Sequence, residues 1–161
     1  MLKWLVIVDE HTRECLSLKV SRNITSEDVI DILAELFAER GAPEGIRSDN
    51  RPEMTSNAIR EWLKKVGVKP LYIEPGSPWQ NGYAESFFSR FRDEFLATEE
   101  FENLQAAQSL TKAWRHDYNH QRPHSSLGYL PPAEFANRCA VSATPPPALQ
   151  QHTDPNQSPT T

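Results

Sequence analysis

The sequence predicts an α/β fold, a mixed sheet flanked by helices, from three observations. Two short stretches near the amino terminus are rich in apolar residues at strand spacing. Two amphipathic helical patterns then alternate with two short apolar stretches, and two further helical patterns follow. The length of 161 residues fits one domain with a modest core.

The first two predicted strands form an antiparallel hairpin. Residues 3–8 are apolar and partly β-branched, and the polar residues 9–14 are suited to a turn. Residues 15–20 alternate apolar and polar side chains, which predicts one buried face. Asp9 lies at the mouth of this hairpin, and that position favours a turn-forming role for its carboxylate.

The middle of the chain predicts two helices and two strands. Helix-start residues at 23–28 precede an apolar repeat at helical spacing. Residues 45–49 predict a short strand that leads into a turn. The second helix carries apolar residues from 58 to 66 and ends at Gly67, and residues 68–73 form the fourth strand.

The last third of the predicted domain is helical. Two prolines and two glycines exclude regular structure from residues 75–82. This loop leads to a helix from about 83 to 96, and a second helix runs from 103 to about 118. An irregular arm at 122–132 and a short turn at 133–137 complete the domain.

Composition sets the outer limits of the domain and of its function. The predicted domain is 1–138, and residues 139–161 form a proline-rich tail that predicts disorder. With neither a secretion signal nor a membrane-length apolar run in the sequence, the expected location is the cytoplasm. Cys15 and Cys139 belong to no paired motif, which predicts reduced thiols. The net charge of −5 argues against a generally basic DNA-coating protein, but not against a metal-dependent enzyme with a local basic stripe.

Two carboxylates are candidates for chemistry. Asp49 stands where a strand ends and a turn begins, the place where open α/β sheets present functional groups, although such an aspartate more often starts a turn or caps a helix. Glu85 lies early on a helix that follows a constrained loop. At helical spacing Glu85, Ser89 and Arg92 share a stripe beside the buried face, which is also what a solvated helix face looks like.

The motifs around these carboxylates resemble those of DDE-type insertion-sequence transposases and retroviral-type integrases. Asp49 and Glu85 have 35 residues between them, as in the D-35-E half of the family's signature. Residues 48–53 resemble its S-D-N-G-x-E segment, and residues 75–88 resemble its loop-to-glutamate segment. Residues 118–135 resemble its carboxy-terminal signature, which contains Arg-Pro-His. The resemblance extends over residues 3–137.

The resemblance implies a ribonuclease H-like fold and an enzyme that cleaves DNA and transfers strands. In that chemistry water, and then a DNA 3′ hydroxyl, attacks a phosphodiester. Asp49 and Glu85 would be two of three carboxylates that hold two Mg²⁺ or Mn²⁺ ions, and Arg92 would contact phosphate or orient them. The implied partners are transposon ends, target DNA and further copies of the protein, in the bacterial cytoplasm at the nucleoid. No membrane and no small-molecule cofactor is implied.

The sequence also departs from the family pattern. The family's first catalytic aspartate belongs on a central strand that would precede Met1, so the sequence predicts a core that lacks this strand. The resulting unpaired edges predict poor solubility or no activity for this chain alone. Arg51 replaces a glycine, at an expected cost of about 1–2 kcal/mol if that turn requires a left-handed residue. Met54 replaces a common aromatic residue.

Further residues are candidates for contacts with DNA or metal. The basic cluster consists of Arg60, Lys64, Lys65 and Lys69. This cluster contacts phosphates or is a solvated helix face. Gln80 and Asn81 either cap the next helix or contact DNA. His116 and His120 are one helical turn apart but lack the acidic partner of an H-E-x-x-H metal site.

Two alternatives to an active transposase remain open. The first alternative is a catalytically inactive transposase remnant that retains DNA binding or subunit association. A generic ribonuclease H-like nuclease is the other alternative, and the Arg-Pro-His arm disfavours it.

Overall fold

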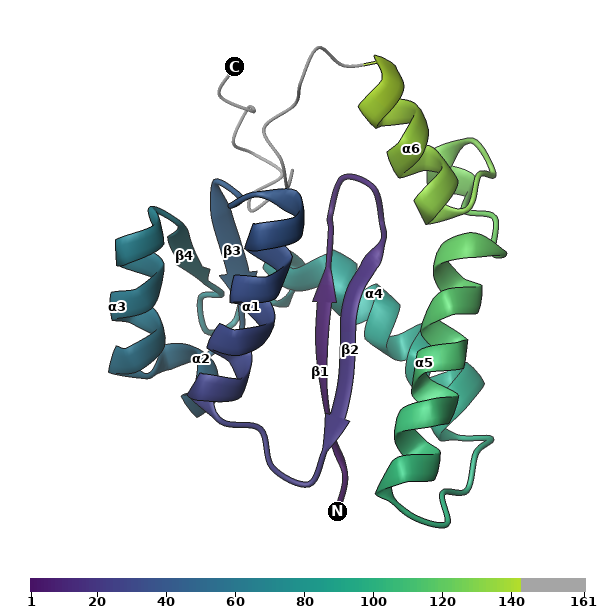
Figure 1. Cartoon of the computed structure of the whole chain (residues 1–161), viewed down its shortest axis with the longest axis horizontal. Coiled ribbons are helices and arrows are strands. Elements are labelled where there is room, and N and C mark those ends of the chain that lie inside the picture. Colours follow the sequence, from purple (N-terminus) through teal and green to yellow (C-terminus); the bar gives the residue numbers. More distant parts are fainter. Residues whose placement is uncertain (143–161) are drawn as a thin grey trace. The chain divides into compact units, whose positions relative to one another are not determined.

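The structure, a computed structural model, describes residues 1–142. These residues divide into two compact units, and each is described by itself (Figure 1). The first unit contains residues 1–23 and the described residues from 83 onward. The second unit contains residues 24–82. Among the described residues, no helix combines the length and apolar character needed to cross a membrane.

The first unit begins with the predicted hairpin. Strands β1 (Lys3–Val8) and β2 (Cys15–Ser21) pair antiparallel, with a shift of register near the turn. The Asp9 carboxylate is buried and accepts hydrogen bonds from the backbone N–H groups of His11 and Thr12, at 2.8 and 3.2 Å. Its predicted role as a turn-forming residue is confirmed.

Three helices complete the first unit. They are α4 (Gly82–Phe91), α5 (Leu104–His120) and α6 (Pro132–Ser142). The helix predicted over 83–96 is α-helical only to Phe91 and continues as a π-helical turn, Arg92–Leu96. The short turn predicted at 133–137 is wrong, because α6 begins at Pro132, a residue suited to the first turn, and passes the expected domain boundary at 138. Residues 143–161 of the expected disordered tail lie outside the described residues.

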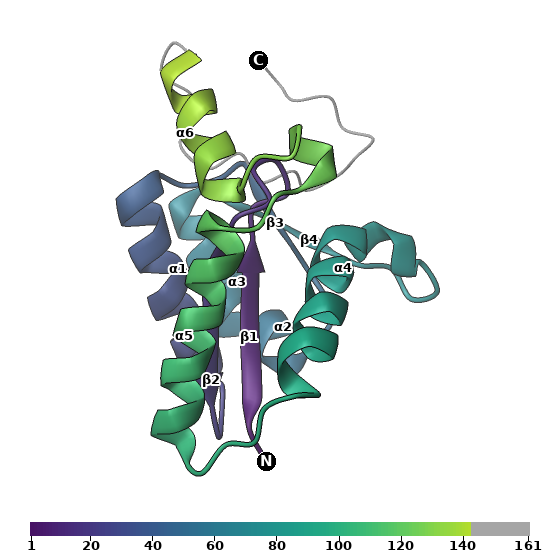
Figure 2. The same cartoon turned by 90° about the vertical axis from the view of Figure 1, so that its right-hand side faces the viewer.

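The core of the first unit consists mainly of aromatic rings. Its buried members are Phe87, Phe91, Phe95, Trp114 and Tyr118, together with Cys15. Phe91 is fully buried, and its ring centroid lies 4.9 Å from that of Trp114 and 5.0 Å from that of Phe95. Phe87 and Phe91 of α4 therefore point into this core, on the face that the sequence predicts to be buried. Helix α5 runs alongside β2 (Figure 1), and α6 follows near the end of α5 (Figure 2).

The second unit alternates helices and strands as predicted. Its elements are α1 (Ser26–Arg40), β3 (Gly45–Ser48), α2 (Pro52–Thr55), α3 (Asn57–Val66) and β4 (Lys69–Tyr72). Helix α2 is a single turn that the sequence had placed in a loop. It begins at a proline, whose fixed φ suits the first position of a helix.

Local signals in the second unit act as the sequence predicts. Thr25 caps α1 through a reciprocal capping box with Asp28. Helix α3 ends at Gly67, whose φ of +74° is the left-handed conformation that glycine adopts without strain. Helices α1 and α3 pack together, and the rings of Phe37 and Trp62 stack with centroids 5.5 Å apart.

The described strands form two sheets, whereas the sequence predicted one mixed sheet. The pair β1–β2 is antiparallel, and the pair β3–β4 is parallel. Among residues 1–142, no strand hydrogen-bonds to both pairs.

Candidate functional site

Asp49 follows the last residue of β3, as the sequence predicts. The strand end is held by the Ile73 N–H, which donates to the Ser48 carbonyl at 3.1 Å. The Asn50 side-chain amide in turn donates to the Ile73 carbonyl at 3.1 Å. These bonds fix the backbone on both sides of Asp49, whose side chain is 45% exposed. The carboxylate is thus accessible to a ligand from solvent.

Arg51 forms an ion pair with Asp49. Its Nε atom lies 2.9 Å from Oδ2, and its backbone N–H donates to Oδ1 at 3.4 Å. The expected left-handed strain at this position is wrong, because Arg51 has φ −64° and ψ 145°. This extended conformation is the one that the following Pro52 favours. The residue that departs from the family pattern therefore places a positive charge on the candidate metal ligand.

The loop between β4 and α4 is organised by Gln80. Its side-chain oxygen accepts from the Glu74 N–H at 2.9 Å, and its backbone carbonyl accepts from Nη1 of Arg47 at 2.6 Å. Gln80 and the half-buried Asn81 end a 3₁₀ turn, Pro78–Asn81. The sequence did not single out Trp79, which is 72% exposed here. The sequence signal for it was a tryptophan within a polar loop, where it would be exposed.

Glu85 occupies the first turn of α4 and is exposed. The amino-terminal turn of a helix favours a carboxylate, because unpaired backbone N–H groups concentrate positive potential there. Arg92 begins the π-helical turn and lies 3.4 Å, through Nε, from Oδ1 of Asp93. Within the first unit no hydrogen bond or ion pair joins Glu85 to Arg92. The shared stripe that the sequence predicts is thus not a direct contact.

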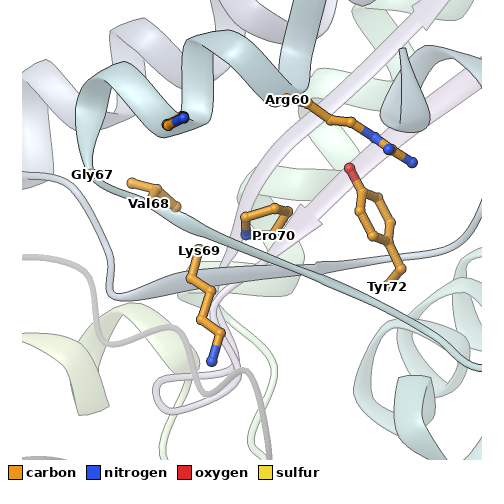
Figure 3. A pocket seen from close by; sticks show the side chains of 7 residues that line it. Arg60, Gly67, Val68, Lys69, Pro70 and Tyr72 are labelled. Carbon is orange, nitrogen blue, oxygen red and sulfur yellow. The ribbon is translucent and has the colours of Figure 1, made fainter. Parts of the chain in front are cut away.

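The predicted basic cluster is partly brought together. Arg60, Lys64 and Lys69 line one open hollow of about 490 Å³ in the second unit, between α3 and β4 (Figure 3). Lys65 is exposed on α3 but does not line this hollow. Three of the four cluster residues therefore share one surface of the second unit, and Lys65 lies apart from them.

The carboxylates have the right donor chemistry for Mg²⁺, which prefers oxygen ligands and is commonly held by one or two carboxylates together with substrate phosphates. Asp49 and Glu85 supply exposed oxygens. Within neither unit do three or more carboxylate, imidazole or thiol groups of the described residues converge. The rings of His116 and His120 lie 4.4 Å apart, but they offer two ligands only.

The carboxy-terminal motif that resembles the family signature is structural. Asn119 is buried, and its amide accepts from the Cys15 N–H at 2.8 Å and donates to the Cys15 carbonyl at 2.9 Å, as a neighbouring strand would. Arg122 pairs with Glu94 and Asp117. These contacts join α5 to β2, and the residue pair Arg122–Glu94 ties the segment after α5 to the π-helical turn. The motif was identified in the sequence by its resemblance, but this structural role was not predicted.

His124 continues the motif as a buried side chain. Its ring packs edge-on against Tyr118, with centroids 5.0 Å apart. Burial, and then the charges of Arg90, Arg13 and Arg122, lower the pKa of His124. The imidazole is therefore more readily kept neutral in the folded protein.

Family models match both parts of the chain. Two models, each described as an integrase core domain, match residues 2–78 and 66–132. An IS476 protein of Xanthomonas euvesicatoria is 43% identical over 84% of this chain and 39% of its own length. An IS407 protein of Burkholderia multivorans is 41% identical over 93% of this chain and 54% of its own. The chain thus spans about half the length, or less, of these relatives.

Other matches are more distant. The transposase InsD of insertion element IS2E in Escherichia coli is 30% identical, over 81% of this chain and 63% of its own length. The catalytic core domain of BIV integrase has a TM-score of 0.65 at 20% identity, over 88% of this chain and 94% of that one. The simian T-cell lymphotropic virus intasome contains a chain with a TM-score of 0.68 at 17% identity, over 100% of this chain and 57% of its own. The fold is ribonuclease H-like.

Proposed function

Because this chain belongs to the integrase core family, as a DDE-type insertion-sequence transposase, we propose that it acts in DNA transposition through Asp49 and Glu85. The proposal rests on one observation above the others. Two carboxylates with the family's 35-residue spacing are both exposed, one at the end of β3 and one in the first turn of α4. Carboxylate oxygens are the ligands that metal-dependent phosphodiester chemistry uses, and each of these two is accessible from solvent in its own unit.

Each residue has a distinct task in this proposal. Asp49 and Glu85 hold Mg²⁺ or Mn²⁺, which when bound would activate the attacking oxygen and stabilise the leaving one. Arg92, exposed beyond Glu85 on the same helix, binds a substrate phosphate. Gln80 keeps the loop before α4 in one conformation, and Asn81 at its end contacts DNA. The substrates are transposon ends and target DNA in the bacterial cytoplasm, and self-association brings two ends together.

A catalytically inactive form that retains DNA binding is the second candidate. The ion pair between Arg51 and Asp49 favours it, since the guanidinium occupies one of the two proposed ligands. Within each unit, the described residues bring no three metal-ligating side chains together, which favours it as well. In that form the chain would bind the same DNA as an intact transposase and compete with it.

Cleavage of DNA that carries the element's ends distinguishes the two candidates. Residues 1–161 are incubated with labelled end DNA and Mg²⁺ or Mn²⁺, beside the chain extended by any residues encoded in frame upstream. Nicking that Asp49→Asn and Glu85→Gln both abolish would support the enzyme. Binding of end DNA without cleavage by either form would support the inactive one.

A further inference from the structure

We propose that the hollow between α3 and β4 binds the sugar–phosphate backbone of DNA, with Arg60 and Lys64 on a phosphate. This deepens the proposed function and rests on it only in taking DNA as the ligand, because the hollow shares no residue with the proposed metal site. It is lined by Arg60, Lys64, Gly67, Val68, Lys69, Pro70 and Tyr72 (Figure 3). No acidic side chain is among these residues.

The charge of the hollow is the first argument. Arg60 and Lys64 are exposed and stand four residues apart on α3, which places them on one face of the helix. Neither forms an ion pair with any described residue, whereas Arg51 and Arg122 do. In a chain of net charge −5, two adjacent unneutralised cations mark a local site for an anion.

Tyr72 is the second argument, as a positioning residue for Arg60. Its hydroxyl donates to the Met54 carbonyl at 3.2 Å, which fixes the ring. The Arg60 guanidinium lies 5.2 Å from the ring centroid and extends beside it (Figure 3). An aromatic neighbour orients a guanidinium and leaves N–H groups free for the two oxygens of a phosphate. Arg60 is therefore held ready before a ligand arrives.

The apolar part of the hollow identifies the kind of anion. Pro70 and the ring of Tyr72, both half-buried, line it beside the cations, and a free phosphate would make no favourable contact with such an apolar surface. A deoxyribose next to its phosphate presents C–H groups that would cover it. Contacts of this kind carry no base information, so binding should be independent of DNA sequence. Lys69 projects in another direction from Arg60 and adds longer-range attraction only (Figure 3).

The test measures binding of residues 1–161 to two unrelated fluorescent DNA duplexes by anisotropy, in EDTA and between about 50 and 200 mM salt. EDTA separates this site from any metal-dependent step. Arg60→Ala and Lys64→Ala should each weaken binding to both duplexes about five- to tenfold. Each should also reduce the slope of log affinity against log salt by about one. Lys112→Ala, which removes an exposed charge from α5, should change affinity by less than about twofold.

Tyr72 is tested through its coupling to Arg60. Tyr72→Leu should weaken binding in the wild-type background and have no further effect in Arg60→Ala, whereas Tyr72→Phe, which keeps the ring but loses the hydrogen bond to Met54, should weaken binding less than Tyr72→Leu. A loss of fold alone would not produce that pattern, and thermal unfolding of each variant checks it.

Three results would overturn the proposal, and they separate it from the proposed function. If the wild-type chain binds duplex and the Arg60 and Lys64 variants bind equally well, the hollow is not a DNA site and the proposed function stands. If the loss is confined to one duplex, the hollow reads bases instead of the backbone. If the wild-type chain binds neither duplex in EDTA, the hollow is not a DNA site, and the cleavage assay with Mg²⁺ or Mn²⁺ decides the proposed function separately.

Discussion

The ion pair between the Arg51 guanidinium and the Asp49 carboxylate predicts that Arg51→Gly binds a metal ion more tightly. The ion pair has a separation of 2.9 Å, but its side chains are 61% and 45% exposed. Solvent screens such a pair, so it contributes about 0.2–1 kcal/mol. A metal ion at Asp49 must displace this interaction, which lowers metal affinity by about 1.4-fold to 5-fold. Removing Arg51 also removes its repulsion of a dication, and this acts in the same direction.

Mn²⁺ binding provides the assay, because free Mn²⁺ is counted directly by electron paramagnetic resonance. Arg51→Gly and Arg51→Gln should both bind Mn²⁺ more tightly than the wild-type chain at low salt. The difference should shrink at high salt as screening increases. Arg138→Gln is the matched control, since it breaks an exposed ion pair of 2.8 Å to Glu134 on α6.

Asp49→Asn should abolish the gain in the Arg51→Gly background. Equal Mn²⁺ affinity of the wild-type chain and both Arg51 variants at low salt would refute the reasoning. An equal gain from Arg138→Gln would refute it too, because the effect would then reflect net charge alone.

The remaining predictions concern the first unit. Asn119→Ala leaves the buried Cys15 N–H unpaired and should lower the free energy of unfolding by about 1–3 kcal/mol in urea titrations; a loss below about 0.5 kcal/mol would contradict the strand-like role of the amide. Burial raises the pKa of the Cys15 thiol to about 12. A disulfide reagent should therefore label Cys139 in the native protein and Cys15 only after denaturation. Labelling of the native Cys139→Ser variant, in which Cys15 is the remaining thiol, would contradict this. Because the pKa of His124 is lowered on folding, the unfolded chain takes up the proton first. The free energy of unfolding should therefore fall as pH drops below about 6.5, and less so in His124→Phe.

Much of the fold follows from local sequence signals. The capping residues of α1, the glycine after α3 and the alternation in β2 each specify structure over a few residues, and all three elements form where predicted. The π-helical turn could not be predicted this way, since an apolar repeat at helical spacing does not distinguish a π turn from an α turn. The length of α6 was missed because polar, proline-rich composition beyond it obscured a helix that begins at Pro132.

The candidate site was predictable where it depends on local chain position and not where it depends on contacts between residues. The exposure of Asp49 and Glu85 follows from their places at the ends of a strand and at the start of a helix. The ion pair of Asp49 depends on the extended backbone that Pro52 favours at Arg51. In the sequence, the family's glycine at this position pointed to left-handed strain instead. The contact between Arg60 and Tyr72 joins α3 to β4, and a sequence pattern carries no such distance.

The π-helical turn at Arg92–Leu96 affects how this chain should be aligned with its relatives. A π turn accommodates one residue more than the α-helical turn it replaces. A relative with a plain α-helix here would therefore lack one residue, and an alignment gap belongs within 92–96. Glu85 and Arg92 keep their seven-residue spacing when the gap falls after Arg92, the first residue of the turn. Residue correspondences after Leu96 are offset by one if the gap is left out.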